Sequence, residues 1–196
     1  MALLHRPKSY LRDYLGHQMC VLFVGINPGL RSAGVGHHFA GYSNRFWKLL
    51  YGSGLIPVPL TYRDDWRLPE YGLGITNIIS KKSADSSVLG LADYRAGFAS
   101  LERKIRYYRP RIVALLGVTI YRMLFLQAKH TARSLSLGPT TTRLAGTPIF
   151  LLANPSGRNA HYSYEQMLKA FIRLHKHVRE LDPKGSTKGV RHNRRS

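Results

Sequence analysis

The sequence predicts an α/β fold in which a short, mostly parallel sheet is covered by helices on both faces. Four short apolar runs are continuous rather than alternating, as in strands that are buried on both sides. The segments between them carry apolar residues at spacings of three and four, which is typical of helices with one buried face. Because strands and helices alternate along the chain, we expect the sheet to be largely parallel.

The predicted strands are CVLFVG at 20–25, LGITNII at 73–79, IVALLG at 112–117 and PIFLLAN at 148–154. A short helix is predicted to begin near Asn44, whose side chain can cap it, and apolar stripes predict two longer helices over 94–108 and 164–178. The proline- and aromatic-rich segment 57–72 is expected to be an irregular connection. Residues 138–147 are expected to form a loop or hairpin before the last strand.

The length of 196 residues suits a single domain, which we assign to residues 1–181. Residues 182–196 are basic, contain glycine and lack an apolar stripe, so we expect a mobile tail there.

The composition points to a polyanionic partner. Lys and Arg number 30 against 10 Asp and Glu, a formal net charge of +20, which favours binding to nucleic acid. The single cysteine, Cys20, excludes an intramolecular disulfide and any zinc or iron–sulfur site built from four cysteines. No apolar run reaches the length of a membrane span, and charges interrupt the short apolar start of the chain. We therefore expect no membrane association, no signal peptide and a cytoplasmic location.

Two of the predicted strands are followed by an Asn-Pro turn and small residues. GINPGLRSAGVGHHFAG follows the first strand and NPSGRNAHYS follows the fourth. Ligands of open parallel sheets bind beyond the carboxyl ends of the strands, so both segments are expected at one site. Neither segment contains a Walker motif, and Phe39 stands where a dinucleotide fingerprint has its third glycine. A nucleotide-cofactor enzyme is therefore poorly supported.

The first of these segments begins a longer pattern. GINPGLRSAGVGHHFAGYSNRFWKLLYGSGL, GITNII, RAGFASLERKIRYYRPRIVALLG and NPSG follow one another along the chain. In this order they resemble the mismatch-specific uracil/thymine-DNA glycosylases, the Mug and thymine-DNA glycosylase branch of the uracil-DNA glycosylase superfamily. The resemblance covers about residues 21–174. It implies a three-layer α/β sandwich and a monofunctional glycosylase that needs no metal or other cofactor.

The reaction implied by this resemblance is hydrolysis of the N-glycosidic bond of a base that has left the DNA stack. By match to GINPG, Asn27 would orient the attacking water, although its amide is no general base at neutral pH. A structural Asn in an unusual turn is the alternative for this position. Asp93 would supply a charge that supports the sugar cation or the water. An equally simple interpretation makes Asp93 the cap of the helix that it opens.

Three further residues are expected to bind the flipped base. Phe39 matches the aromatic residue that stacks on the base, and Ile26 and backbone N–H groups of the same loop would contact the base edge. Asn77 in GITN could read the pyrimidine edge through its amide. The alternatives are a core aromatic for Phe39 and a strand-end cap for Asn77. His37 and His38 are either contacts to phosphate or the leaving base, or polar loop residues.

The remaining site residues are expected to contact DNA. Small residues let backbone amides approach a phosphate. Arg158 stands where the bacterial Mug type has an apolar wedge, so the wedge contact is in doubt. Its guanidinium could instead fill the gap left by the base, bind the orphaned guanine, or contact phosphate alone. The predicted DNA-binding residues are Ser32, Asn154, Ser156, Gly157, Arg158 and Asn159.

The leading hypothesis is a monomeric DNA glycosylase that excises uracil, and other altered pyrimidines, opposite guanine in double-stranded DNA. If the source is bacterial, such an enzyme would associate with the nucleoid. The alternative from another class is a catalytically silent, basic nucleic-acid-binding α/β module. The composition fits both, and only excision activity separates them.

Overall fold

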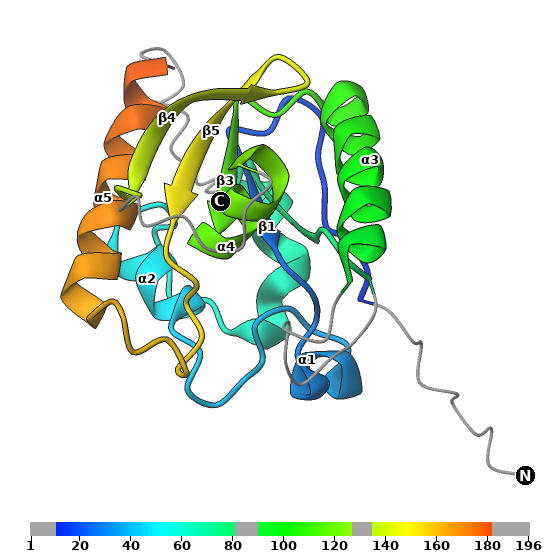
Figure 1. Cartoon of the computed structure of the whole chain (residues 1–196). Helices are drawn as coiled ribbons and strands as arrows, with labels where there is room; N and C mark the ends of the chain where they lie inside the picture. Colours follow the sequence, from blue (N-terminus) through cyan, green and yellow to red (C-terminus); the bar gives the residue numbers. More distant parts are fainter. Residues whose placement is uncertain (1–10, 81–89, 127–134, 182–196) are drawn as a thin grey trace, which may run out of the picture.

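The computed structural model describes residues 11–80, 90–126 and 135–181. These residues contain a sheet with the strand order β2-β1-β3-β5-β4 (Figure 1). The parallel strands are β1 (Val21–Gly25), β2 (Leu73–Asn77), β3 (Ile112–Leu116) and β5 (Thr147–Leu152), and β4 (Gly138–Leu144) is antiparallel to β5. The predicted mostly parallel α/β sheet is confirmed, and the segment before the last strand is a hairpin.

The central strand β1 explains why its sequence is continuously apolar. Val21 and Phe23 face one hydrophobic cluster, whereas Leu22 and Val24 face another on the opposite side of the sheet. All four side chains are fully buried. Alternation is absent from the sequence because neither face of the strand meets water.

Helices complete the three layers (Figure 1). On one face α2 (Phe46–Gly52) and α5 (Tyr164–Leu181) pack through residues such as Phe46 and Phe171, whose rings contact Phe23. On the other face α3 (Leu91–Tyr108) contributes Leu101 and Ile105, beside α4 (Val118–Tyr121). The short helix predicted near Asn44 and the two helices predicted from periodicity are therefore present. The N-cap of α2 is Arg45 and not Asn44, but the Asn44 side chain accepts a hydrogen bond from the Phe46 N–H (2.9 Å) at the start of the helix.

The structure corrects the expected irregular connection at 57–72. Residues Tyr62–Tyr71 form a 3-10 helix, η1, closed at its start by reciprocal hydrogen bonds between Thr61 and Asp64. The segment 26–45, which joins β1 to α2, is called the first loop below. The sequence also gave no sign of α1 (Leu30–Val35) inside this loop or of the π-helical turn η3 (Arg122–Leu126). These elements are too short to show a periodicity.

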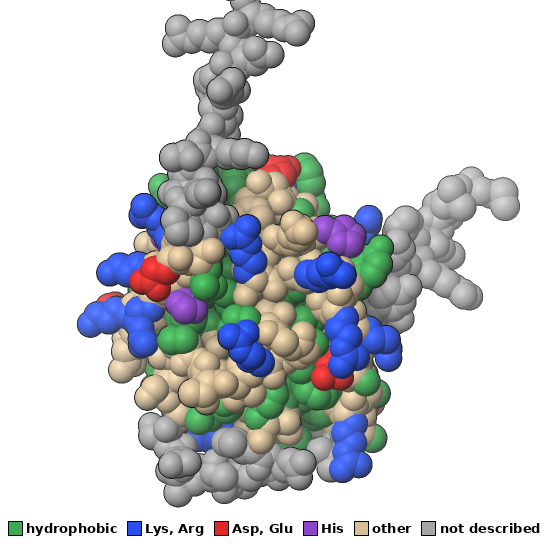
Figure 2. Space-filling model, turned by 90° about the horizontal axis from the view of Figure 1, so that it is seen from above, with side chains coloured by type: hydrophobic (Ala, Val, Ile, Leu, Met, Phe, Trp, Pro, Cys, Tyr) green, Lys and Arg blue, Asp and Glu red, His purple; other side chains and the backbone are tan. Residues whose placement is uncertain are grey.

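Positive charge covers the end of the sheet at which the parallel strands begin (Figure 2). Figure 2 views the end at which the parallel strands begin, and this face carries many Lys and Arg side chains and few Asp or Glu. Charge alone therefore does not locate a site. Among the described residues, no helix is both long and apolar enough to span a membrane. The predicted tail, 182–196, lies outside the described residues.

Candidate active site

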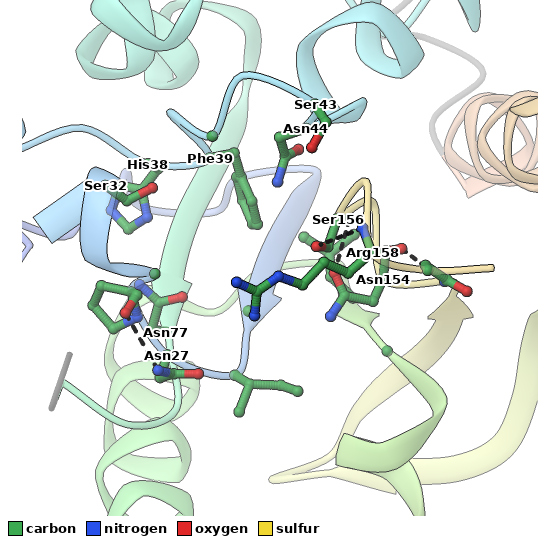
Figure 3. Close-up of a pocket in the computed structure, with 18 of the residues that line it drawn as sticks. Asn27, Ser32, His38, Phe39, Ser43, Asn44, Asn77, Asn154, Ser156 and Arg158 are labelled. Atoms are coloured by element: carbon green, nitrogen blue, oxygen red, sulfur yellow. Dashed lines mark hydrogen bonds between the residues drawn. The ribbon is translucent and has the colours of Figure 1, made fainter. Parts of the chain in front are cut away.

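A cavity of about 560 Å³ lies at the carboxyl ends of the parallel strands (Figure 3). Its lining comes from the segment after β1, the end of β2, the turn after β3 and the segment after β5. Open parallel sheets bind ligands at this edge, and the volume is ample for a nucleobase. The predicted site residues that line the cavity are Ile26, Asn27, Ser32, Phe39, Asn77, Asn154, Ser156, Arg158 and Asn159.

Internal hydrogen bonds shape the first loop. The Arg31 Nε–H donates to the Ala40 carbonyl (2.7 Å), and the Ala40 N–H donates to the Ser32 hydroxyl (3.0 Å). Ser32 is 7% exposed, so its hydroxyl closes the loop instead of facing solvent. This placement does not support direct contact between the Ser32 side chain and DNA. The closed loop brings Asn27 and Phe39 to the same cavity.

Asn27 follows β1 directly and lies at the base of the cavity. Its side-chain Nδ2 donates to the Pro28 carbonyl (3.3 Å), which sets the rotation of the amide. The amide oxygen is on the other side and points toward the middle of the cavity (Figure 3). An oxygen in this position can accept a hydrogen bond from a water molecule.

Phe39 provides an aromatic wall. Its φ of 52° is in the left-handed region, which is rare for a residue with a bulky side chain. The ring packs on the fully buried Phe46, with centroids 4.3 Å apart and planes 30° apart. Phe39 is half-buried, packs against the hydrophobic core on one side and lines the cavity on the other.

Gly25, at the end of β1, is a site residue that the sequence did not single out. A Cβ at this position would lie 2.5 Å from the Asn77 Oδ1 and 3.4 Å from the Phe39 Cζ. Glycine therefore lets the Asn77 amide and the Phe39 ring close on the strand end. Ile26 is 8% exposed and packs in the core beneath α3, so little of its side chain is left to meet a base edge.

The second loop, 154–162, uses its polar side chains to hold its own backbone. The Asn154 Oδ1 accepts from the Ser156 N–H (3.0 Å), and the Ser156 Oγ accepts from the Arg158 N–H (3.3 Å). The Asn159 Nδ2 donates to the Asn154 carbonyl (2.9 Å). These side chains fix the loop conformation that lines the cavity.

Arg45 ties this loop to the start of α2 and was missed from the sequence. Its N–H donates to the Pro155 carbonyl (2.9 Å), and its guanidinium donates to the carbonyls of Asn159 (3.1 Å) and Tyr162 (3.2 Å). Gly157 does not line the cavity, but it packs against Ser43 on the first loop so closely that a Cβ would overlap it. No local sequence pattern predicts the contacts of Arg45 or Gly157, because their partners lie more than a hundred residues away in the chain.

The electrostatics of the cavity are positive. Arg31 and Arg158 line it, and among the residues that the structure describes no Asp or Glu does. The Arg158 side chain extends from the second loop toward the space between Phe39 and Asn27 (Figure 3). A cavity with two guanidiniums and amide side chains suits a neutral polar ligand attached to an anionic chain.

His38 lines the cavity but is only 1% exposed. Its Nε2 donates to the Arg12 carbonyl (3.0 Å), which leaves Nδ1 as the ring nitrogen without a proton when the ring is neutral. Burial lowers the pKa of His38 below its ordinary value of 6.5, although the hydrogen bond to the Arg12 carbonyl and the charges of Asp65 and Asp13 act in the opposite direction. The ring is therefore neutral at pH 7.

The lowered pKa of His38 predicts an acid-sensitive fold. Below about pH 6.5 the unfolded chain takes up a proton that folded His38 does not bind, so the free energy of unfolding should fall as the pH drops from 6.5 toward the folded pKa. Urea unfolding of the wild type and of His38→Gln at pH 8, 6.5 and 5.5 measures this. The variant should lose less stability over this range, and an unchanged slope would contradict the assignment.

Asp93 lies in the first turn of α3 and is not among the residues that line the cavity. Its carboxylate accepts a hydrogen bond from the Gly90 N–H (3.0 Å) and so caps the helix. The structure therefore favours the capping interpretation and does not bring Asp93 into the cavity lined by Asn27, the other predicted catalytic residue. The preceding carboxylate, Asp85, lies outside the described residues.

Asp93→Asn should accordingly change stability more than chemistry. Loss of a negative charge at the helix start should lower the free energy of unfolding by about 0.3–1 kcal/mol. Any excision activity should stay at the wild-type rate. Thermal unfolding measures the stability, and a single-turnover assay measures the rate of excision. A large loss of the excision rate in a stable variant would show that Asp93 takes part in catalysis.

Comparison with protein families agrees with this geometry. The family model described as the uracil DNA glycosylase superfamily matches residues 13–176, well over half of the chain. The match spans the sheet, its covering helices and both loops of the cavity. The enzymes of this superfamily are hydrolases that act on DNA, and the chain belongs to the uracil DNA glycosylase superfamily.

Proposed function

We propose that this protein is a monofunctional glycosylase of the mismatch-specific uracil/thymine branch, which excises uracil opposite guanine in double-stranded DNA. The observation that carries the proposal is the pairing of the Asn27 amide with the Phe39 ring across one cavity. An aromatic face suits a base that has left the stack, and an amide oxygen suits a water that must attack the sugar.

In this mechanism Asn27 orients the nucleophile. Its oxygen accepts a hydrogen bond from water and directs a lone pair of the water toward C1′ of the deoxyribose. The amide cannot remove the proton at neutral pH, so bond cleavage runs ahead of attack and the sugar develops oxocarbenium character. The electron pair of the broken bond leaves with the pyrimidine, and the proton that the water loses after adding to C1′ passes to solvent. Such a site works best on bases that leave easily, among which is uracil.

The base itself would lie against Phe39, whose stacking is worth about 1–3 kcal/mol. Asn77, held against Gly25, has a donor and an acceptor for a pyrimidine edge. Arg158 extends from the second loop toward the same space (Figure 3). Its guanidinium would fill the gap left in the duplex or bind the orphaned guanine.

The deciding experiment is base excision on defined duplexes. Protein in excess is incubated with duplexes containing G·U, A·U, G·T or G·C and with single-stranded uracil DNA, and hot alkali then cleaves abasic sites. We expect fast cleavage at G·U, slower cleavage at A·U, G·T and single-stranded uracil DNA, and none at G·C. Cleavage at A·U as fast as at G·U would remove the mismatch specificity. Binding without cleavage of any substrate would instead favour the catalytically silent nucleic-acid-binding module.

A further inference from the structure

Asp65 on η1 is a fully buried carboxylate outside the cavity lining. Its Oδ1 accepts a hydrogen bond from the His37 Nδ1 (2.9 Å), and its Oδ2 accepts one from the His38 N–H (2.8 Å). A buried carboxylate is costly unless its oxygens are hydrogen-bonded or paired with a cation. Both oxygens are used here on two consecutive residues of the first loop, about 27 positions earlier in the chain.

One of these hydrogen bonds holds the His38 backbone immediately before Phe39, and the other holds the His37 side chain. The Ser32 hydroxyl holds the backbone immediately after Phe39, through the Ala40 N–H (3.0 Å). Between the two clamps, Phe39 adopts its φ of 52°. A non-glycine residue stays in this region only when the surrounding structure imposes the conformation.

The position of the Phe39 ring depends on that backbone conformation. The ring lies 4.3 Å from the Phe46 ring, centroid to centroid, and its tip reaches the end of β1 at Gly25. A return of φ to negative values would carry the side chain in another direction, away from Phe46. The aromatic wall of the cavity is therefore set by hydrogen bonds made one and two residues away.

We propose that Asp65 is a positioning residue that holds Phe39 in place as the stacking surface for an extruded pyrimidine. This inference rests on the proposed function and deepens it. Asp65 touches neither the base nor the water, and it acts through His37 and the His38 backbone. Its effect should therefore disappear when the Phe39 ring is absent.

The chain offers a matched pair of variants for the test. Asp65→Asn keeps the size of the side chain but replaces one of the two acceptor oxygens by an NH2 donor, so it cannot accept both hydrogen bonds, and it removes the charge that favours a proton on the His37 Nδ1. Asp64→Asn is the control, because Asp64 is the adjacent carboxylate on η1 and serves the exposed Thr61 cap. If Asp65→Asn does not fold, His37→Ala takes its place in the test, because it removes one of the two hydrogen bonds at the partly buried His37 side chain.

A double-mutant cycle that combines Asp65→Asn with Phe39→Ala measures the coupling between the two residues. Under single-turnover conditions on G·U duplex, we expect Asp65→Asn to lower the maximal rate by about tenfold while the half-saturating protein concentration stays unchanged. Asp64→Asn should keep the wild-type rate. In the Phe39→Ala background, Asp65→Asn should have no further effect. An equal loss in both backgrounds, or no loss in either, overturns the inference.

A second measurement separates this inference from the proposed function. Nuclear Overhauser contacts between the Phe39 and Phe46 rings should be present in the wild type and in Asp64→Asn and be lost in Asp65→Asn. Retained contacts in Asp65→Asn overturn the positioning role whatever the activity. A wild type that keeps these contacts but excises no base refutes the proposed function alone.

Discussion

Asn27→Ala should lower the single-turnover rate of uracil excision from a G·U duplex by about 10²–10³-fold, the usual effect of removing one fixed hydrogen-bonding group from a catalytic site. The expectation rests on the Asn27 amide, whose Nδ2 is bound to the Pro28 carbonyl and whose oxygen points into the cavity. Alanine removes the oxygen that would align the water. It leaves the loop backbone in place, because Arg31 and Ser32 close the loop independently.

The affinity of Asn27→Ala for the same duplex should match that of the wild type. The Asn27 amide lies at the base of the cavity, whereas the contacts expected to bind DNA come from the second loop and from basic side chains. Excision is measured with protein in excess, and binding is measured with a duplex that carries a non-cleavable 2′-fluorinated deoxyuridine. A variant that excises at the wild-type rate would mean that another group holds the water. A variant that no longer binds would make Asn27 a binding residue.

The sheet could be predicted because its strands are buried on both faces, which leaves a continuous apolar run in the sequence. The longer helices could be predicted because one face of each is apolar. In contrast, η1 is a 3-10 helix that places one buried carboxylate, Asp65, against the first loop. Nothing near Asp65 in the sequence distinguishes it from Asp64 beside it, which is only partly buried. Only the folded chain shows which of the two is buried.

In the candidate site, too, part of the arrangement could be predicted from the sequence and part could not. The resemblance of the two loops to known motifs was enough to select residues that do line one cavity, such as Asn27 and Phe39. It could not assign their hydrogen bonds. Asp93 caps α3, and Ser32 closes its own loop. Conversely, Arg45 holds the second loop through three carbonyls although its sequence position predicted only a helix start.

Substitution of Gly157 should have the second large effect on excision, because the two loops are in contact at this residue. A Cβ on Gly157 would overlap the Ser43 side chain and would lie 2.8 Å from the Ser43 carbonyl oxygen. A side chain can rotate away, but a backbone carbonyl in a held loop cannot do so cheaply. The second loop is also fixed on either side of Gly157, since Arg45 binds the carbonyls of Pro155 and Asn159. The added methyl group must therefore push residues 156–158 outward.

Gly157→Ala should consequently lower both excision and DNA affinity, with a loss of excision of about 10²-fold for a displacement of about 1 Å. Gly34→Ala is the matched control, since a Cβ at Gly34 meets nothing within 4 Å, and it should keep wild-type excision and affinity. The double variant Gly157→Ala/Ser43→Gly removes the side-chain overlap but not the carbonyl contact, so it should recover part of the loss. Wild-type excision by Gly157→Ala would show that the contact between the loops does not position the second loop for DNA.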